Sequence, residues 1–149
     1  MGKMTDKVLV TISGLQFDME GQSPVELVTV GDYYLKNGKH YVVFEEEDSE
    51  GAGETRTILK IANDQVNVVR SGANNVNMVF EKDKKNMTYY ETPYGEFFMG
   101  LNTLDIDLQE TDTLVEATIV YTLELNYAHI SDCKIVLKVQ AKPDKDHFH

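Results

Sequence analysis

Apolar and polar residues alternate with a period of two along almost the whole chain, which is the pattern of half-buried β-strands. The clearest case is residues 115–125, where charged and threonine side chains separate the apolar positions. Its apolar stripe is Val115, Ala117, Ile119, Tyr121, Leu123 and Leu125. No stretch of about ten residues has a helical stripe, so the sequence predicts an all-β protein.

The alternating segments predict about eight to ten strands joined by short turns. Asn37-Gly38 is a strong signal for a tight hairpin, because both residues tolerate the positive φ of a type I′ turn. Thr92-Pro93-Tyr94-Gly95 predicts a type I turn between two aromatic segments. Gly31 predicts a bend or a bulge in a long strand over 25–37. The apolar phase also switches near 100–103, which predicts a bulge or a sharp bend there.

Sequential hairpins favour one antiparallel sheet that runs mostly up and down and closes into a barrel, since closure removes exposed strand edges. A two-sheet sandwich is the alternative. No repeat or linker divides the chain, so we expect a single domain over 1–149 with a frayed polar tail at 142–149.

The composition limits the classes of function. The 25 acidic and 14 basic residues give a net charge of −11, which argues against nucleic acid and anionic membranes as partners. No apolar run approaches the roughly 20 residues of a membrane helix, and no signal peptide is visible. The single cysteine, Cys133, excludes an intramolecular disulfide. We therefore expect an acidic cytoplasmic protein.

Several sequence motifs resemble those of the YwiB-like family of small bacterial proteins. The most specific is Tyr89-Tyr90-Glu91-Thr92-Pro93-Tyr94-Gly95, and the resemblance covers nearly the whole chain. The other matching segments are 10–14, 26–29 with Gly31 and Tyr33-Tyr34, 57–61, 70–72 and 78–80. The resemblance implies a calycin-like β-barrel, similar in shape to lipocalins, and it assigns no catalytic or binding residues.

The aromatic hairpin supplies the first candidate site. Its rings could help line a ligand pocket, because small barrels can hold one ligand and phenols place polar groups on apolar walls. They could equally fill the barrel interior, since an eight-stranded barrel is just wide enough to be filled by side chains. The five aromatic residues are Tyr89, Tyr90, Tyr94, Phe97 and Phe98.

Arg70 is the second candidate, because it follows Val66 and Val68 at alternate positions and is therefore predicted to point inward. Its guanidinium could bind a ligand carboxylate or phosphate. The alternative is a structural ion pair with Glu45 or Glu91, or exposure beyond the strand end. Arg70 with Glu91 and the nearby tyrosines is also where an enzymatic site would be sought.

The sequence predicts no metal site and no cofactor. Residues 45–51 are acidic and end in glycine, but the closing glutamate of a calcium loop is replaced by Thr57. The four histidines lack zinc-site spacing apart from His147 and His149 in the tail. Cys133 lies on an apolar strand face, where an inert thiol is expected.

These observations favour a non-catalytic protein that binds a small apolar or amphipathic ligand in its barrel. Two alternatives stay open. The first is a protein-interaction module with a filled core, whose protein partner the sequence does not identify. The second is an enzyme of unidentified reaction.

Overall fold

The structure is a computed structural model that describes residues 6–14, 26–47, 54–72, 75–92 and 95–142. The middle of the predicted type I turn, Pro93 and Tyr94, lies outside these residues. The same is true of most of the acidic loop and of the tail with His147 and His149.

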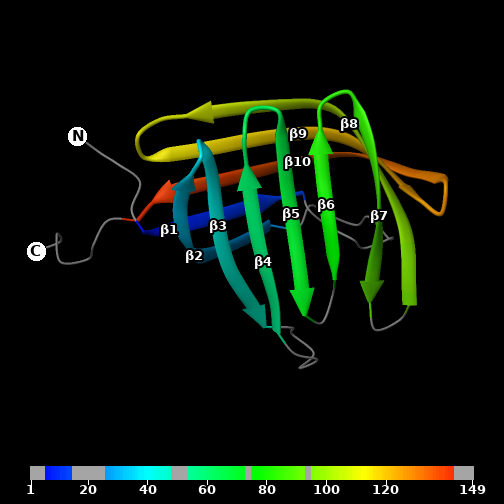
Figure 1. Ribbon diagram of the computed structural model, residues 1–149, viewed down its shortest axis with the longest axis horizontal. Helices are drawn as coiled ribbons and strands as arrows, with labels where there is room; N and C mark the ends of the chain where they lie inside the picture. The colour runs from blue at the N-terminus through cyan, green and yellow to red at the C-terminus, as the bar shows by residue number, and fades with distance from the viewer. Residues whose placement is uncertain (1–5, 15–25, 48–53, 73–74, 93–94, 143–149) are drawn as a thin grey trace, which may run out of the picture.

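Ten antiparallel strands follow one another along the chain, which confirms the predicted all-β meander (Figure 1). The described residues contain no helix. The strands are β1 Lys7–Ser13, β2 Glu26–Lys36, β3 Lys39–Glu47, β4 Glu54–Ile61, β5 Gln65–Gly72, β6 Val76–Glu81, β7 Lys84–Thr92, β8 Gly95–Glu110, β9 Leu114–Leu125 and β10 Ala128–Ala141.

All ten strands belong to one sheet, in the order β6-β5-β4-β3-β2-β1-β10-β9-β8-β7. The sheet curls so that β3 to β6 cross in front of β1, β10 and β9 (Figure 1). Its two end strands, β6 and β7, come together and share the backbone bridge between Asn75 and Glu91. The result is a nearly closed barrel rather than a two-sheet sandwich.

The sheet turns a corner at Gly31. Residues 26–32 of β2 pair with β1, whereas residues 32–36 pair with β3. Gly31 is buried at this change of partner, where a β-carbon would lie 3.0 Å from the Val43 carbonyl oxygen and 3.1 Å from Val42 Cγ1. The predicted bend is confirmed, and it needs glycine because the neighbouring strand approaches so closely.

The predicted change of phase in β8 is a β-bulge. Thr103 pairs with Tyr121 and Asp105 pairs with Val120, so Leu104 is the extra residue and is exposed. Ile106 therefore returns to the inner face that holds Met99 and Leu101. A β-bulge of one residue reverses the apparent alternation without changing which side of the wall is buried.

Side chains fill the middle of the barrel. Val10, Leu59, Phe80, Leu101 and Ile119 come from five strands and have no exposed surface. Odd-numbered strands finish at one end of the barrel, and the Asn37-Gly38 turn lies at the other. Its φ values of 54° and 76° fit the predicted type I′ turn.

We predict that Gly31→Val lowers the free energy of unfolding by about 1–3 kcal/mol, because its methyl groups would press on the β3 backbone. Urea denaturation measures the loss. Gly38→Ala is the control, since no atom lies within 4 Å of its new β-carbon and only the positive φ costs about 1 kcal/mol. A Gly31→Val protein as stable as the wild type contradicts the proposed corner.

Candidate functional site

A layer of half-buried, inward-facing side chains lies at the end of the barrel where the odd-numbered strands finish. Below this layer, towards the middle of the barrel, most inner side chains are buried. The layer mixes apolar, aromatic, charged and thiol groups, and we call it the mouth. Its members are Leu27, Glu46, Arg70, Tyr90, Phe97, Leu125 and Cys133.

Arg70 points into the mouth, as the alternation with Val66 and Val68 predicts. Its Nη2 donates to Oε1 of Glu46 at 3.0 Å, and the side chains are 18% and 26% exposed. The predicted ion pair is therefore confirmed, but Glu45 and Glu91 were the wrong partners. Along β3, His40, Val42, Phe44 and Glu46 face inward, so Glu45 faces out.

A buried hydroxyl lies beside Arg70. Thr57 is directly opposite Arg70 in the β4–β5 register and is 1% exposed. Among the residues that the structure describes, its Oγ1 has no hydrogen-bond partner. A buried hydroxyl without a hydrogen-bond partner lowers the stability of the folded protein by about 1–3 kcal/mol.

Tyr90 and Phe97 form the aromatic wall of the mouth. They are directly opposite one another in the β7–β8 hairpin, and Tyr90 packs against the buried core. Burial raises the pKa of Tyr90 above its ordinary value, while the nearby positive charge of Arg70 lowers it in part. The Tyr90 phenol is therefore a neutral hydrogen-bonding group near the guanidinium at neutral pH.

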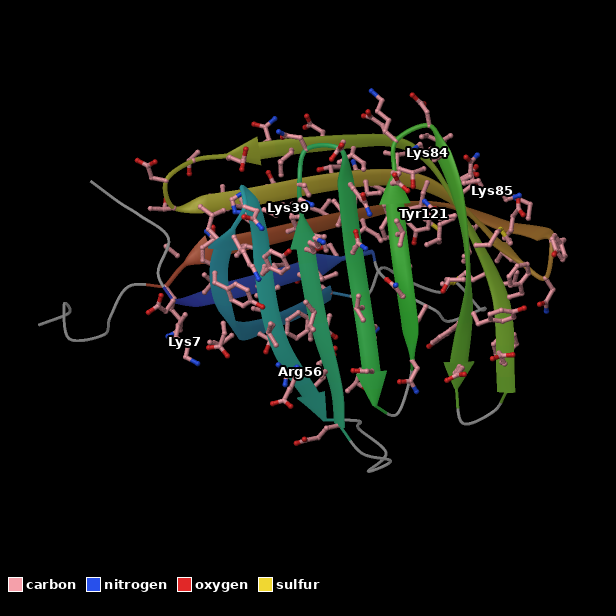
Figure 2. All side chains as sticks on the ribbon, viewed as in Figure 1. Lys7, Lys39, Arg56, Lys84, Lys85 and Tyr121 are labelled. Atoms are coloured by element: carbon pink, nitrogen blue, oxygen red, sulfur yellow. The ribbon has the colours of Figure 1, made fainter. Side chains whose placement is uncertain are left out.

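Cys133 belongs to a polar cluster at the floor of the mouth. Cys133 is directly opposite Tyr121 in the β9–β10 register, and its thiol lies 3.1 Å from Ser131 Oγ. Tyr121 is 2% exposed and lies behind β6 in Figure 2, with its ring 4.9 Å from that of Phe80. Burial, and then the Cys133 thiol, strongly raise the pKa of Tyr121. The sequence indicated the inward position of Cys133 but not its hydrogen bonds.

Of the other aromatic candidates, Tyr89 and Phe98 do not belong to the mouth. The register pairs Tyr89 with Phe98 and Glu91 with Glu96, so these four residues occupy the outer face of β7 and β8. Tyr89 and Phe98 therefore do not line the interior, because alternate residues of a strand face opposite sides. Arg70 and Glu91 likewise lie on opposite sides of the barrel wall. Tyr94 lies outside the described residues.

A second polar cluster closes the opposite end of the barrel. Tyr33 Oη lies 2.8 Å from Nδ1 of the buried His40, and His40 Nε2 contacts Oε2 of Glu110. When Tyr33 donates to Nδ1, the ring donates its Nε2–H to the carboxylate. Burial, followed by the negative charge of Glu110, raises the pKa of Tyr33. The cluster joins β2 and β3 to β8 across the barrel.

This second cluster was not predicted from the sequence. The alternation of His40 with Val42 and Phe44 could have placed His40 inward. Glu110 lies 70 residues away and meets His40 only because the barrel closes.

Within the described residues, no group of three or more His, Cys, Asp or Glu side chains is arranged to hold a metal ion. A helix long and apolar enough to cross a membrane is also absent from that part of the chain.

Comparisons with known proteins agree with the barrel. Residues 10–137 match the family described as "Domain of unknown function (DUF1934)". The uncharacterized β-barrel protein YwiB of Bacillus subtilis is 30% identical over 110 residues, which are 72% of this chain and 76% of that protein. The crystal structure of the B. subtilis ywiB protein has a TM-score of 0.73, with 23% identity over 92% of this chain and 91% of that one.

We predict that Tyr33→Phe lowers the free energy of unfolding by about 1 kcal/mol, because buried His40 Nδ1 loses its hydrogen-bond partner. Chemical denaturation measures the change. Tyr34→Phe is the matched control, since Tyr34 is exposed and stacks on Tyr41 through its ring. Equal stabilities for the Tyr33 variant and the wild type would show that the cluster contributes nothing.

We predict that the protein loses stability above pH 10. An unfolded tyrosine ionises near pH 10, whereas burial keeps folded Tyr121 protonated well above that value. Above pH 10, each buried tyrosine of this kind lowers the free energy of unfolding by up to about 1.4 kcal/mol per pH unit. Below pH 10, the unfolded tyrosine is protonated as well, so its stabilising contribution is fully present.

Denaturation between pH 9 and 11.5 tests this dependence. Tyr121→Phe should flatten the pH slope, and exposed Tyr127→Phe should leave it unchanged. Tyr33 and Tyr90, whose pKa values are also raised, should retain part of the slope. An identical slope in Tyr121→Phe and wild type contradicts the prediction.

Proposed function

We propose that this chain binds a small apolar or amphipathic ligand at the mouth of its barrel, without catalysis. The chain belongs to the DUF1934 family, whose function is unknown, so the proposal rests on the geometry of the barrel itself. One observation carries the proposal. The inward side chains of the mouth are partly exposed and combine apolar walls with a guanidinium, whereas the layers below are closed. Binding sites for small molecules commonly combine apolar walls with a few polar groups in this way.

The filled interior supports a ligand that sits at the mouth rather than deep in the barrel. Leu27, Phe97 and Leu125 offer apolar surface to its nonpolar part. The Arg70 guanidinium, whose side chain is 18% exposed, offers hydrogen bonds to its polar end. A carboxylate or other small anion is the polar group that best matches a guanidinium.

Glu46 competes with such an anion. It accepts a hydrogen bond from Arg70, so an anionic ligand has to share the guanidinium with it or displace it. This competition favours amphipathic ligands, whose apolar part contributes binding free energy that a bare anion lacks.

We also infer a cytoplasmic location and a calycin-like barrel. The lone cysteine supports the first, and the up-and-down meander of ten strands supports the second. The acidic net charge continues to argue against nucleic acid and anionic membrane as partners.

We predict opposite effects of two charge-removing substitutions on binding of the anionic dye 8-anilinonaphthalene-1-sulfonate. Glu46→Gln should strengthen binding, because it removes the carboxylate that competes for Arg70. Arg70→Gln combined with Glu46→Gln should weaken binding about 10-fold relative to Glu46→Gln, since a hydrogen bond to a charged group contributes about 1.5–3 kcal/mol. Fluorescence titration measures both.

Two controls sharpen this test. Tyr89→Ser lies on the outer face and should leave the affinity for the dye unchanged. The neutral dye Nile red should respond to Leu125→Ser but not to the charge changes. Dye binding that ignores all the mouth substitutions, together with no co-purifying ligand in native mass spectrometry, would exclude the mouth as a binding site.

A further inference from the structure

Three aromatic rings form a surface on the outside of the barrel, on the other side of the β7–β8 wall from the mouth. Tyr89 of β7 lies 4.9 Å from Phe98 of β8, and Phe98 lies 5.3 Å from Tyr127 between β9 and β10, measured between ring centroids. Tyr89 is 57% exposed and Tyr127 is 76% exposed. We call Tyr89, Phe98 and Tyr127 the aromatic face.

The backbone holds Tyr127 in an unfavourable conformation. Asn126 and Tyr127 have φ values of 51° and 72°, as in a type I′ turn, where glycine is preferred at the second position. The Asn126 amide donates to the Phe98 carbonyl at 2.7 Å, and Asn126 Oδ1 accepts from the Phe98 amide at 3.1 Å. These bonds fix the turn on β8 and keep an exposed ring where a glycine would be less strained.

Two carboxylates lie directly next to the aromatic face. Glu91 and Glu96 are opposite one another in the β7–β8 register, one step along the outer face from Tyr89 and Phe98. Both are exposed, and neither has an ion-pair partner among the described residues. Like charges directly opposite each other destabilise a strand pair, so this arrangement is unfavourable in the isolated protein.

Further along the outer face of β7, a charged residue does have an ion-pair partner. Lys85 of β7 lies beyond Met87, and its Nζ is 2.7 Å from a carboxylate oxygen of Glu124 (Figure 2). That charge is neutralised by Glu124 of β9, whereas the Glu91 and Glu96 charges have no such partner within the described ranges. The negative charge beside the rings therefore remains available to an external cation.

We propose that the aromatic face and the Glu91–Glu96 pair together form a docking surface for a basic segment of a partner protein. A lysine or arginine side chain would lie over the exposed faces of Tyr89 and Tyr127, with its charge against the carboxylates. Aromatic rings attract cations through their quadrupole, and two adjacent carboxylates add to that attraction. Binding would also relieve the repulsion between Glu91 and Glu96.

Charge complementarity favours a basic segment over a second copy of the chain or a nucleic acid as the partner at this surface. A second copy of the chain in a twofold contact would bring another Glu91–Glu96 pair to the same surface, because such an interface joins identical patches. Each copy also carries a net charge of −11. A nucleic acid would meet repulsion from the same charges.

The test is an NMR titration of the full chain with hexalysine, using hexaserine and hexaglutamate as controls. Hexalysine should shift the backbone amide signals of Tyr89, Phe98 and Tyr127, and the two control peptides should not. Failure of hexalysine to bind, or shifts spread over the barrel without preference for these residues, overturns the proposal.

Two charge variants distinguish a specific surface from general attraction to an acidic protein. Glu96→Lys should weaken hexalysine binding about two- to fivefold, on the typical strength of exposed charge pairs. It should also raise the melting temperature, because Glu91 gains an oppositely charged neighbour. Asp107→Lys on the outer face of β8 makes the same change in net charge and should weaken binding less. Equal losses in the two variants overturn the proposal.

Tyr127→Gly should change stability and binding in opposite directions, which is not expected if Tyr127 serves only to stabilise the turn. Glycine relieves the positive φ, so the melting temperature should rise, whereas loss of the ring should weaken hexalysine binding about two- to fivefold. A variant that binds hexalysine as tightly as the wild type removes Tyr127 from the docking surface and contradicts the proposal.

Discussion

Every residue of a strand in this barrel must face either the packed interior or the outer surface, and its neighbour must face the other side. This constraint decides which residues reach the mouth more strongly than the residue type does. Tyr89 and Tyr90 are adjacent and chemically identical, yet Tyr90 lines the mouth and Tyr89 stands in solvent. Glu45 and Glu46 differ in the same way, and only Glu46 can reach Arg70.

The same constraint explains how much of the structure the sequence could predict. The strands, the Asn37-Gly38 turn, the Gly31 corner and the β8 bulge follow from alternation and from glycine, which act locally. The inward position of Arg70 is also local, since Val66 and Val68 set its phase. The aromatic hairpin was harder, because both faces of β7 and β8 carry rings and period alone cannot say which face is inside.

Contacts across the barrel could not be predicted from one sequence, because they depend on closure. Glu110 reaches His40 only when β8 and β3 meet at the same end, and no local pattern carries that information. The Arg70 partner posed a smaller version of this problem, because Glu46 lies on β3, two strands away from β5 in the sheet. An error of one residue in register exchanges Glu46 for Glu45, which moves the carboxylate to the other side of the wall.

The two faces of the β7–β8 hairpin therefore present different chemistry on one short piece of chain. Inside, Tyr90 and Phe97 border a guanidinium that is already paired with Glu46. Outside, Tyr89 and Phe98 border two carboxylates that have no such partner in the described chain. A wall one strand thick thus separates a surface suited to anions from one suited to cations. Substitutions on one face leave the side chains of the other in place, so the two proposed activities can be tested independently.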